Sequence, residues 1–237
     1  MKLRGRCILL GAAALLCTQV QAGGILTPHQ AEYKVKISIV SGRLNTELRA
    51  TEGGYVAHHV IKPTGLARVI AHGTMDVTSE FASSDAGVKP VAFRSVDTIR
   101  KDPDVDLLFN WDTLEVAGTV GEEDFKQQLD GIVYDSVSLQ YVLMHDLING
   151  APNKQYVLFD VDKLKTANVR NIGTKQVKVK AGKYEALGIQ HQAEGSSRIT
   201  TLWCVEELGY LPVIIEQHRK GKLNFRASLQ KYTPTGG

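Results

Sequence analysis

YKVKISIVSGRLNTELRA, residues 33–50, alternates apolar and polar side chains on both sides of the pair Ser41-Gly42. A period of two is typical of a β-strand with one buried and one solvated face. A Ser-Gly pair between two such runs predicts the turn of a β-hairpin, because glycine adopts the backbone conformations that tight turns require. This stretch therefore predicts an antiparallel hairpin that packs one of its faces on a core.

Runs of the same kind fill most of the remaining chain. They lie at residues 55–61, 69–81, 88–99, 105–111, 123–129, 156–160, 163–169, 175–180, 184–192, 199–205, 213–218 and 222–232. Turn residues separate them at spacings of about 8–12 residues, which is typical of antiparallel sandwiches and barrels. We therefore expect a mainly β protein, in which an antiparallel curved sheet forms a half-barrel or barrel-like structure around one buried α-helix.

The helix is expected at residues 136–148, where the alternation gives way to a nearly continuous apolar run. Asp135 is a candidate cap for its first turn, and Asn149-Gly150 closes the segment. A helix this apolar needs burial on most of its sides, so we expect it to fill the concave face of the sheet. No linker or repeat divides the chain, and residues 23–237 are expected to form a single domain.

Residues 1–22 predict a cleavable signal peptide. Basic residues precede the uncharged run 7–17, and small side chains at positions 20 and 22 suit a cleavage site. The uncharged run is shorter than the roughly 20 residues of a membrane-spanning helix. Leu16 stands before Cys17, where a lipid-attachment motif needs a small residue. We therefore expect a protein of the periplasm of a Gram-negative bacterium, with no transmembrane segment after signal cleavage.

The charge balance argues against a nucleic-acid partner. The chain has 28 Lys plus Arg and 25 Asp plus Glu. Lys2, Arg4 and Arg6 belong to the predicted signal, which leaves 25 basic and 25 acidic residues and no formal net charge. A neutral chain has little overall attraction for polyanions or anionic membranes, and no basic cluster is interleaved with aromatic residues.

Cysteine usage points to stabilisation by the core. Cys7 and Cys17 leave with the predicted signal, so Cys204 is the only cysteine of the mature chain. An intramolecular disulfide is therefore excluded. Cys204 is either a reactive thiol or a small buried side chain in a strand, and we favour the buried side chain.

A calcium loop is the first metal site to test. Asp102, Asp104 and Asp106 have the spacing of its first ligands. Leu107 stands where the loop needs glycine, and Thr113 stands where it needs a bidentate glutamate. We therefore interpret the three aspartates as a solvated turn that leads into a strand.

The other candidates for chemistry are isolated. Asp160 and Asp162 share one face of a strand and are candidates to help bind a cation, but paired carboxylates are common on exposed faces. The seven histidines (29, 58, 59, 72, 145, 191 and 218) show no zinc or metalloprotease spacing. His58 and His59 are adjacent in a strand and are expected to face opposite sides. The sequence therefore assigns no catalytic, cofactor-binding or metal-binding residue, and it predicts no cofactor.

Three further features each have a structural and a functional interpretation. His145 is either a general base or a hydrogen-bonded core histidine, and Trp203 is either a cavity-lining residue or a core anchor. The basic cluster His218, Arg219, Lys220 and Lys222 lies where a hairpin turn is expected and is typical of a solvated tip. We favour the structural interpretation for all three.

The order of several short motifs resembles the bacterial DUF3108 family, a domain of unknown function in exported proteins. The motifs are Ser79-Glu80-Phe81, Pro90 followed by Phe93, Phe109-x-Trp111, Asp135-x-x-Ser138-Leu139, the run 181–186 (AGKYEA), Trp203, the run 209–213 (GYLPV) and a last strand ending near Leu229. They extend from about Tyr33 to Tyr232. The resemblance implies a periplasmic β-rich fold, a curved half-barrel like that of envelope lipoprotein carriers, and it brings no catalytic residue. Likeness of fold does not establish lipid binding.

Two classes of function remain open. The first is a binding or carrier module for a hydrophobic or lipid-like ligand, or for an envelope protein. The apolar helix and the run 199–205, apolar on both faces, favour this class because they imply a lined cavity or cover on both sides. The alternative is a cell-envelope hydrolase, which would need converging His, Asp or Glu side chains that no motif here reveals. We favour a binding or interaction module over an enzyme.

Overall fold

The computed structural model describes residues 26–37, 40–70, 72–150, 152–160 and 163–235. The predicted signal peptide, residues 1–22, lies outside these ranges. Within them, alternating sequence becomes strand throughout. The strands are β1 His29–Ile37, β2 Val40–Thr51, β3 Gly54–Pro63, β4 Met75–Ser84, β5 Gly87–Asp97, β6 Asp102–Asn110, β7 Glu115–Val120, β8 Glu123–Gln128, β9 Val133–Tyr134, β10 Gln155–Asp160, β11 Lys163–Val179, β12 Gly182–Ala193, β13 Arg198–Val205, β14 Leu211–Arg219 and β15 Lys222–Pro234.

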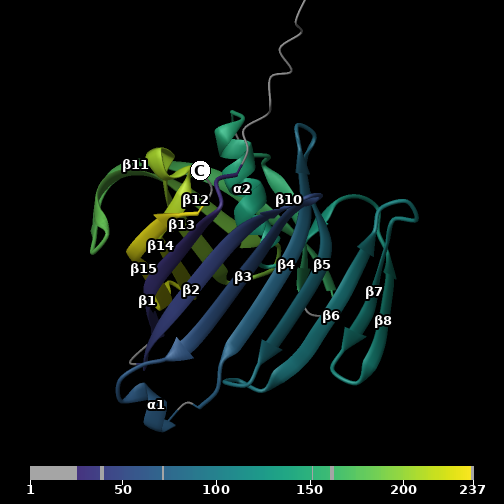
Figure 1. Ribbon diagram of the computed structural model, residues 1–237, viewed down its shortest axis with the longest axis horizontal. Helices are drawn as coiled ribbons and strands as arrows, with labels where there is room; N and C mark the ends of the chain where they lie inside the picture. The colour runs from purple at the N-terminus through teal and green to yellow at the C-terminus, as the bar shows by residue number, and fades with distance from the viewer. Residues whose placement is uncertain (1–25, 38–39, 71, 151, 161–162, 236–237) are drawn as a thin grey trace, which may run out of the picture.

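These strands form one continuous sheet in the order β8-β7-β6-β5-β4-β3-β2-β1-β15-β14-β13-β12-β11-β10-β9 (Figure 1). Pairing of β1 with β15 joins the N-terminal half of the sheet to the C-terminal half. Every ladder is antiparallel apart from the short β9–β10 pair. The predicted antiparallel curved sheet is therefore confirmed.

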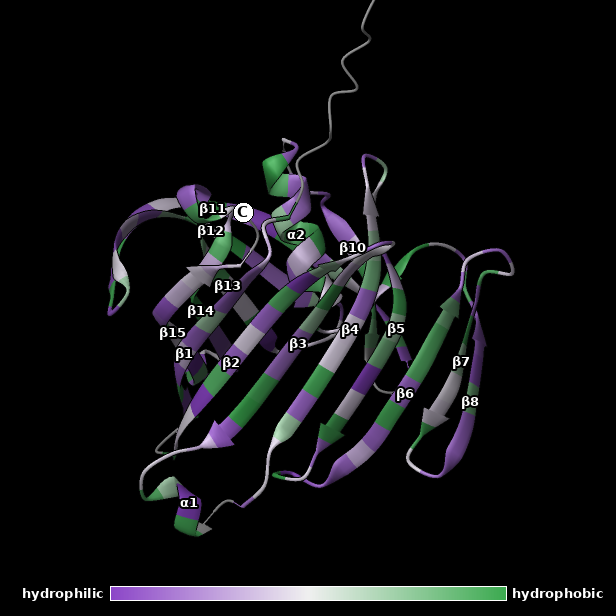
Figure 2. Cartoon of the chain, in the orientation of Figure 1, coloured by the Kyte–Doolittle hydropathy of each residue, from purple (hydrophilic) through white to green (hydrophobic). Residues whose placement is uncertain are grey.

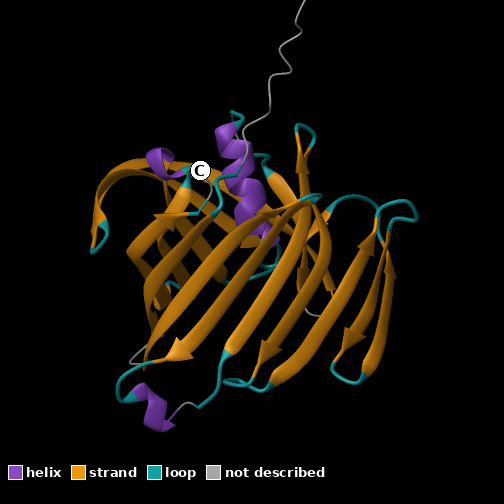
Figure 3. Cartoon of the chain, viewed as in Figure 1, coloured by secondary structure: helices purple, strands orange, loops and turns teal. Residues whose placement is uncertain are grey.

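The sheet curves into a barrel-like shape (Figure 3). Its end strands β8 and β9 are not paired with each other, so the sheet stays open between them. At this opening, the rings of Phe125 on β8 and Phe159 on β10 meet edge to face with their centroids 5.1 Å apart. The two ends of the sheet therefore touch through side chains while their backbones remain unpaired.

Alternation along each strand places apolar side chains on the concave face. In β2, Leu44, Thr46 and Leu48 are buried, whereas the residues between them are less buried or exposed. Figure 2 shows the result as alternating hydrophilic and hydrophobic bands along β3 to β6. The concave face is thus the core of the molecule.

Helix α2, Ser138–Ile148, lies on the concave side of the sheet (Figure 1). It packs mainly against β5 and β4, and even its polar residues Ser138 and His145 are buried. The prediction of one buried helix filling the concave face is confirmed. Two short helices, α1 Ala67–Ile70 and the 3₁₀ turn η1 Glu206–Leu208, lie outside this core. None of the helices in the described ranges is both long and apolar enough to cross a bilayer.

The first hairpin turns at a different place from the one predicted. Ile37 pairs with Val40, so β2 already includes Ser41 and Gly42, which pair with Lys36 and Val35. Gly42 serves a different purpose there, because a Cβ atom at this position would lie 3.1 Å from the carbonyl oxygen of Lys62 on β3. The glycine permits a close approach of two strands and does not form the turn.

Three other boundaries also differ. Residues 69–70 and 72–74 are not strand, because α1 and a loop precede β4. The short strands β7 and β9 were not predicted. The runs 163–169 and 175–180 belong to one strand, β11, whose bulge between Asn171 and Thr174 interrupts the alternation but not the pairing with β12. A bulge interrupts the alternation of apolar and polar residues just as a turn does. The sequence pattern alone therefore does not show that the strand continues beside the same partner.

Candidate functional site

A cavity of about 340 Å³ lies between the N-terminal end of α2 and the concave face of the sheet. Apolar residues make up about half of its lining: Leu44, Leu139, Leu158, Phe159, Ala193, Leu202, Ile215 and Phe225. The polar lining consists of Ser136, Gln140, Ser196, Thr200 and Gln217, together with the titratable residues His59, Lys165, His191 and Arg198. We call this space the α2 cavity.

Strand register brings these residues together from distant parts of the chain. His191 on β12 lies opposite Thr200 on β13, and Thr200 lies opposite Gln217 on β14. Gln217 in turn lies opposite Phe225 on β15. Residues that lie directly opposite each other on paired strands point to the same face of the sheet, as do residues two apart along one strand. The row of cross-strand neighbours therefore forms a continuous wall.

Two histidines in the wall are held in the neutral form. The Nε2 atom of His59 lies 3.2 Å from the hydroxyl oxygen of Tyr141 on α2. Burial, together with the neighbouring His29 and His58, lowers the pKa of His59 to about 3. Burial, with the charge of Arg198 nearby, lowers the pKa of His191 to about 4. Both side chains are therefore polar but uncharged at neutral pH.

The charged lining residues lie toward one end of the cavity. Arg198 and Ser196 belong to the β12–β13 turn, and Lys165 lies near the start of β11. Arg198 is exposed to solvent. Among the lining residues that the structure describes there is no aspartate or glutamate. The cavity therefore has an apolar interior and a positively charged outer end.

A buried carboxylate fixes the helix that forms the inner end. Asp135 is fully buried. Its Oδ1 atom accepts hydrogen bonds from the backbone N–H groups of Val137 and Ser138, both at 2.8 Å, and its Oδ2 atom accepts from the hydroxyls of Ser79 on β4 and Ser138, both at 2.7 Å. Burial raises the pKa of Asp135, and these hydrogen bonds partly offset the rise. The predicted cap thus also ties α2 to the sheet.

A second polar cluster anchors the other end of α2. In His145, Nδ1 lies 3.2 Å from Oδ1 of Asp146, and Nε2 lies 3.1 Å from the carbonyl oxygen of Ser84. The hydroxyl of Tyr156 on β10 donates to the second carboxylate oxygen of Asp146 at 2.6 Å. These two partners of the imidazole are acceptors and favour its protonated form, whereas the amide nitrogen of Asn149, 3.3 Å from Nε2, is a donor and does not. Hydrogen bonding to Asp146 is the largest effect, and the pKa of His145 is raised.

The arrangement around His145 is that of a core histidine. Its ring contacts the backbone carbonyl of Ser84 on β4 and the carboxylate of Asp146, which in turn accepts a hydrogen bond from Tyr156 on β10. His145 is not part of the α2 cavity.

Trp203 and Cys204 also lie away from the cavity. Trp203 points to the convex side, where its Nε1 atom donates to Glu216 at 3.3 Å and the ammonium of Lys175 lies 3.5 Å from its ring centroid. Cys204 is buried, and burial raises the pKa of its thiol. Both residues pack as structural side chains.

The histidine pair and the acidic positions can also be placed. His58 faces the convex side, 2.8 Å from Asp76, while His59 faces the cavity, so the predicted divergence is confirmed. Asp102, Asp104 and Asp106 are exposed along β6. Asp162 and the side chain of Asp160 lie outside the described residues. Nowhere in the described ranges do three His, Cys, Asp or Glu side chains gather as a candidate metal site.

Comparison with known proteins identifies a family and a fold. The chain is similar in structure to a crystal structure of a "beta-barrel-like protein of domain of unknown function DUF1849" from Brucella abortus, with a TM-score of 0.60 and 13% sequence identity over 90% of this chain and 99% of the other. At this identity the likeness concerns the fold alone. No curated protein sequence matches the chain. The family model of DUF3108, a protein family of unknown function, matches residues 30–224. The chain therefore belongs to the DUF3108 family.

Proposed function

We propose that this protein binds a hydrophobic or lipid-like ligand in the α2 cavity. The observation that carries the proposal is the cavity itself, about 340 Å³ in volume and lined by leucine, isoleucine and phenylalanine side chains on the concave face. Small-molecule sites are typically concave, mostly apolar spaces of about 300–1,000 Å³ with a few placed polar groups. The volume lies at the lower end of this range, which suits a single acyl chain or a ligand of similar size.

The lining also suggests how such a ligand is oriented. An apolar chain would lie against Leu44, Leu202 and Ile215, and a polar or anionic end would face Lys165 and Arg198. His59 and His191, neutral because burial lowers the pKa of each, can exchange hydrogen bonds with a ligand without placing further charge inside. An amphiphile fits this gradient better than a wholly apolar molecule does, because buried polar groups require partners.

Native mass spectrometry of the mature chain, purified from the periplasm and followed by lipid extraction, tests this proposal. The result that we expect is a near-stoichiometric adduct whose extracted mass is that of an acyl compound. Ala193→Phe fills part of the cavity and should abolish the adduct, whereas Ala92→Phe, on the half-exposed outer side of β5, should retain it. An apo mass for the wild type, unchanged after incubation with fatty acids and lysophospholipids, would refute ligand binding.

The site of action that we propose is the periplasm. This follows from the basic residues, uncharged run and small residues of positions 1–22. The purification described above also tests this part, because the chain should be recovered from the periplasmic fraction with Gly23 at its N-terminus. Recovery of the intact chain from the cytoplasm would contradict export while leaving the cavity proposal open.

A further inference from the structure

Exposed apolar side chains gather at the end of the sheet onto which the α2 cavity leads. Ile37 is 46% exposed, Leu223 48%, Leu66 89% and Val69 71%. Ile37 pairs with Phe225, a lining residue of the cavity, so the apolar surface continues from the cavity wall to this edge. We call these four residues the apolar rim. Single exposed apolar residues need no explanation, but a group around the mouth of a cavity does.

The turns that carry the apolar rim are also strongly basic. Their exposed cations are Lys36, Lys62, Arg68, Arg198, Arg219, Lys220 and Lys222, which we call the basic rim. Glu194 is the only acidic residue in segments 36–40, 62–69, 194–198 and 218–223. In the described part of the chain none of the seven cations forms an ion pair, whereas Arg43, Arg100, Lys126 and Arg226 do. The positive charge of this surface is therefore not compensated locally.

Backbone contacts hold these turns side by side. The backbone N–H of Thr64 donates to the carbonyl of Ser41, which places the segment leading into α1 beside the start of β2. Pairing of Ile37 with Phe225 brings the β14–β15 turn to the other side of β1. Figure 2 shows the hydrophobic part of α1 at this end of the molecule, separate from the sheet. The two rims thus form one surface, although their residues come from distant parts of the chain.

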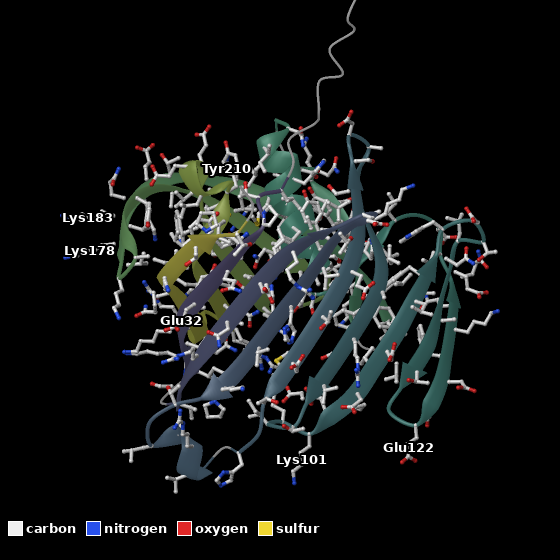
Figure 4. All side chains as sticks on the ribbon, viewed as in Figure 1. Glu32, Lys101, Glu122, Lys178, Lys183 and Tyr210 are labelled. Carbon is white, nitrogen blue, oxygen red and sulfur yellow. The ribbon has the colours of Figure 1, made fainter. Side chains whose placement is uncertain are left out.

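The rest of this end of the sheet has the opposite charge. Gly121 and Glu122 form the β7–β8 turn, Glu123 and Asp124 follow it in β8, and Asp102 and Asp104 follow the β5–β6 turn. Figure 4 shows Lys101 and Glu122 at the tips of these turns, away from α1. The neutral net charge of the mature chain therefore hides a division of this end into a basic half around the cavity mouth and an acidic half.

We propose that the two rims together dock the protein on a membrane surface that contains anionic phospholipids, with the mouth of the α2 cavity facing the lipid. Apolar side chains surrounded by lysine and arginine are the combination that binds lipid interfaces, since the former enter the headgroup region and the latter attract anionic headgroups. The acidic half would be repelled, which tilts the molecule onto its basic side. Docking requires no ligand in the cavity, so the docking proposal and the ligand-binding proposal are tested independently.

Cosedimentation of the mature chain with vesicles tests the proposal. Vesicles of phosphatidylcholine mixed with phosphatidylglycerol should bind the wild type at low salt, and vesicles of phosphatidylcholine alone should bind it weakly. Raising the salt to about 1 M, where the screening length falls to about 3 Å, should weaken binding to the mixed vesicles. Equal sedimentation with the two kinds of vesicle would contradict recognition of anionic lipid.

Two triple variants localise the interaction. Arg219→Glu/Lys220→Glu/Lys222→Glu reverses three rim charges and should lower partitioning into the mixed vesicles by tenfold or more. The reason is that each basic residue near an anionic surface contributes roughly one kcal/mol of attraction. Lys178→Glu/Lys180→Glu/Lys183→Glu makes the same change in net charge on the distant β11–β12 hairpin, where Figure 4 labels Lys178 and Lys183, and should bind much more like the wild type. Equal losses in both variants would show a diffuse charge effect and overturn the proposal.

A further pair of variants tests the apolar part. Leu66→Ser/Val69→Ser should weaken binding to the mixed vesicles, while Leu108→Ser, 63% exposed on the outer side of β6, should not. None of the altered rim residues lines the cavity, so the ligand adduct in native mass spectrometry should persist in all of these variants. Loss of vesicle binding with retention of the adduct therefore separates docking from ligand binding, and unchanged binding of Leu66→Ser/Val69→Ser would remove the apolar rim from the proposal.

Discussion

At the residue scale, two acidic side chains hold α2 in place by different means. Asp135 is fully buried and faces hydroxyl and N–H donors, so it caps the helix through neutral partners. Asp146 faces the imidazole of His145 and the hydroxyl of Tyr156, so part of its contribution depends on the protonation of a histidine. The pair of His145 and Asp146 therefore makes the free energy of unfolding depend on pH near the pKa of histidine. This range lies above the pKa that an aspartate such as Asp135 has in an unfolded chain.

Replacement of His145 should change the pH profile of stability. The pKa of His145 is raised in the folded protein, so its contribution to the free energy of unfolding is complete below the unfolded pKa near 6.5 and is lost as the pH rises through the folded pKa. Between about pH 5.5 and pH 8, the wild type should therefore lose more stability than His145→Gln does. Urea unfolding at both pH values measures this difference, and Asp146→Asn should reproduce the flatter profile. Parallel profiles for wild type and His145→Gln would contradict it.

At the element scale, β11 covers the convex side of its neighbours where other strands face solvent. Ile172 within the bulge and Lys175 after it lie over β12 and β13, and Lys175 contacts the ring of Trp203. Gly188 on β12 leaves the space in which this ring lies. The apolar character of residues 199–205 on both faces is thus explained by cover on both sides, with the α2 cavity and core inside and β11 outside.

Adding a methyl group at Gly188 should disturb this outer layer. A Cβ atom there would lie 2.5 Å from Ile172 Cγ1 and 2.8 Å from Trp203 Cζ3, so the indole ring must move. Overpacking of this kind costs typically about 1–3 kcal/mol, and we expect Gly188→Ala to lose that much stability with a shift in tryptophan fluorescence. Gly53→Ala, where nothing lies within 4 Å, is the matched control for urea unfolding and emission spectra. A Gly188→Ala protein as stable as this control would show that the indole ring moves at no cost.

At the scale of the whole molecule, the sequence predicted the sheet and helix but not how distant strands meet. Alternation is a local signal, and it was sufficient for most strands and for α2 with its Asp135 cap. It failed where an element is very short, as in β9, or where glycine serves strand contact, as at Gly42. Both features depend on which strand lies next to the segment. The alternation of apolar and polar residues does not show which strands are neighbours.

The cavity was out of reach of sequence analysis for the same reason. His59 and Arg198 are separated by most of the chain and line the same cavity because β1 pairs with β15. The adjacent positions of His58 and His59 in one strand showed that one of the two side chains would face inward. They did not show which residues would surround that side chain. The basic tip at residues 218–222 was interpreted as a solvated turn, since its apolar neighbours on α1 and β1 become neighbours only in the folded sheet.

An open sheet of this length needs protection at its ends. Strand β8 carries Glu123, Asp124 and Lys126, and such charges on an edge strand disfavour pairing with another chain. The edge-to-face contact of Phe125 with Phe159 ties β8 to β10 near the opposite end of the sheet. Stability along the sheet should therefore be uneven, with the paired centre at β1 and β15 opening least and β7–β8 opening most readily.

Removing the ring of Phe125 should loosen this end selectively. Phe125→Ala deletes a half-buried aromatic contact, and we expect a loss of about 1–2 kcal/mol in global stability, within the usual range for single substitutions. Hydrogen exchange should accelerate in β7 and β8, whose amides already depend on one another, while β1, β2 and β15 keep their protection because their ladders are unaffected. Leu108→Ala on the exposed side of β6 is the control and should leave both regions unchanged. Uniform acceleration across the sheet would instead mean that the Phe125–Phe159 contact closes the whole barrel-like structure as one cooperative unit.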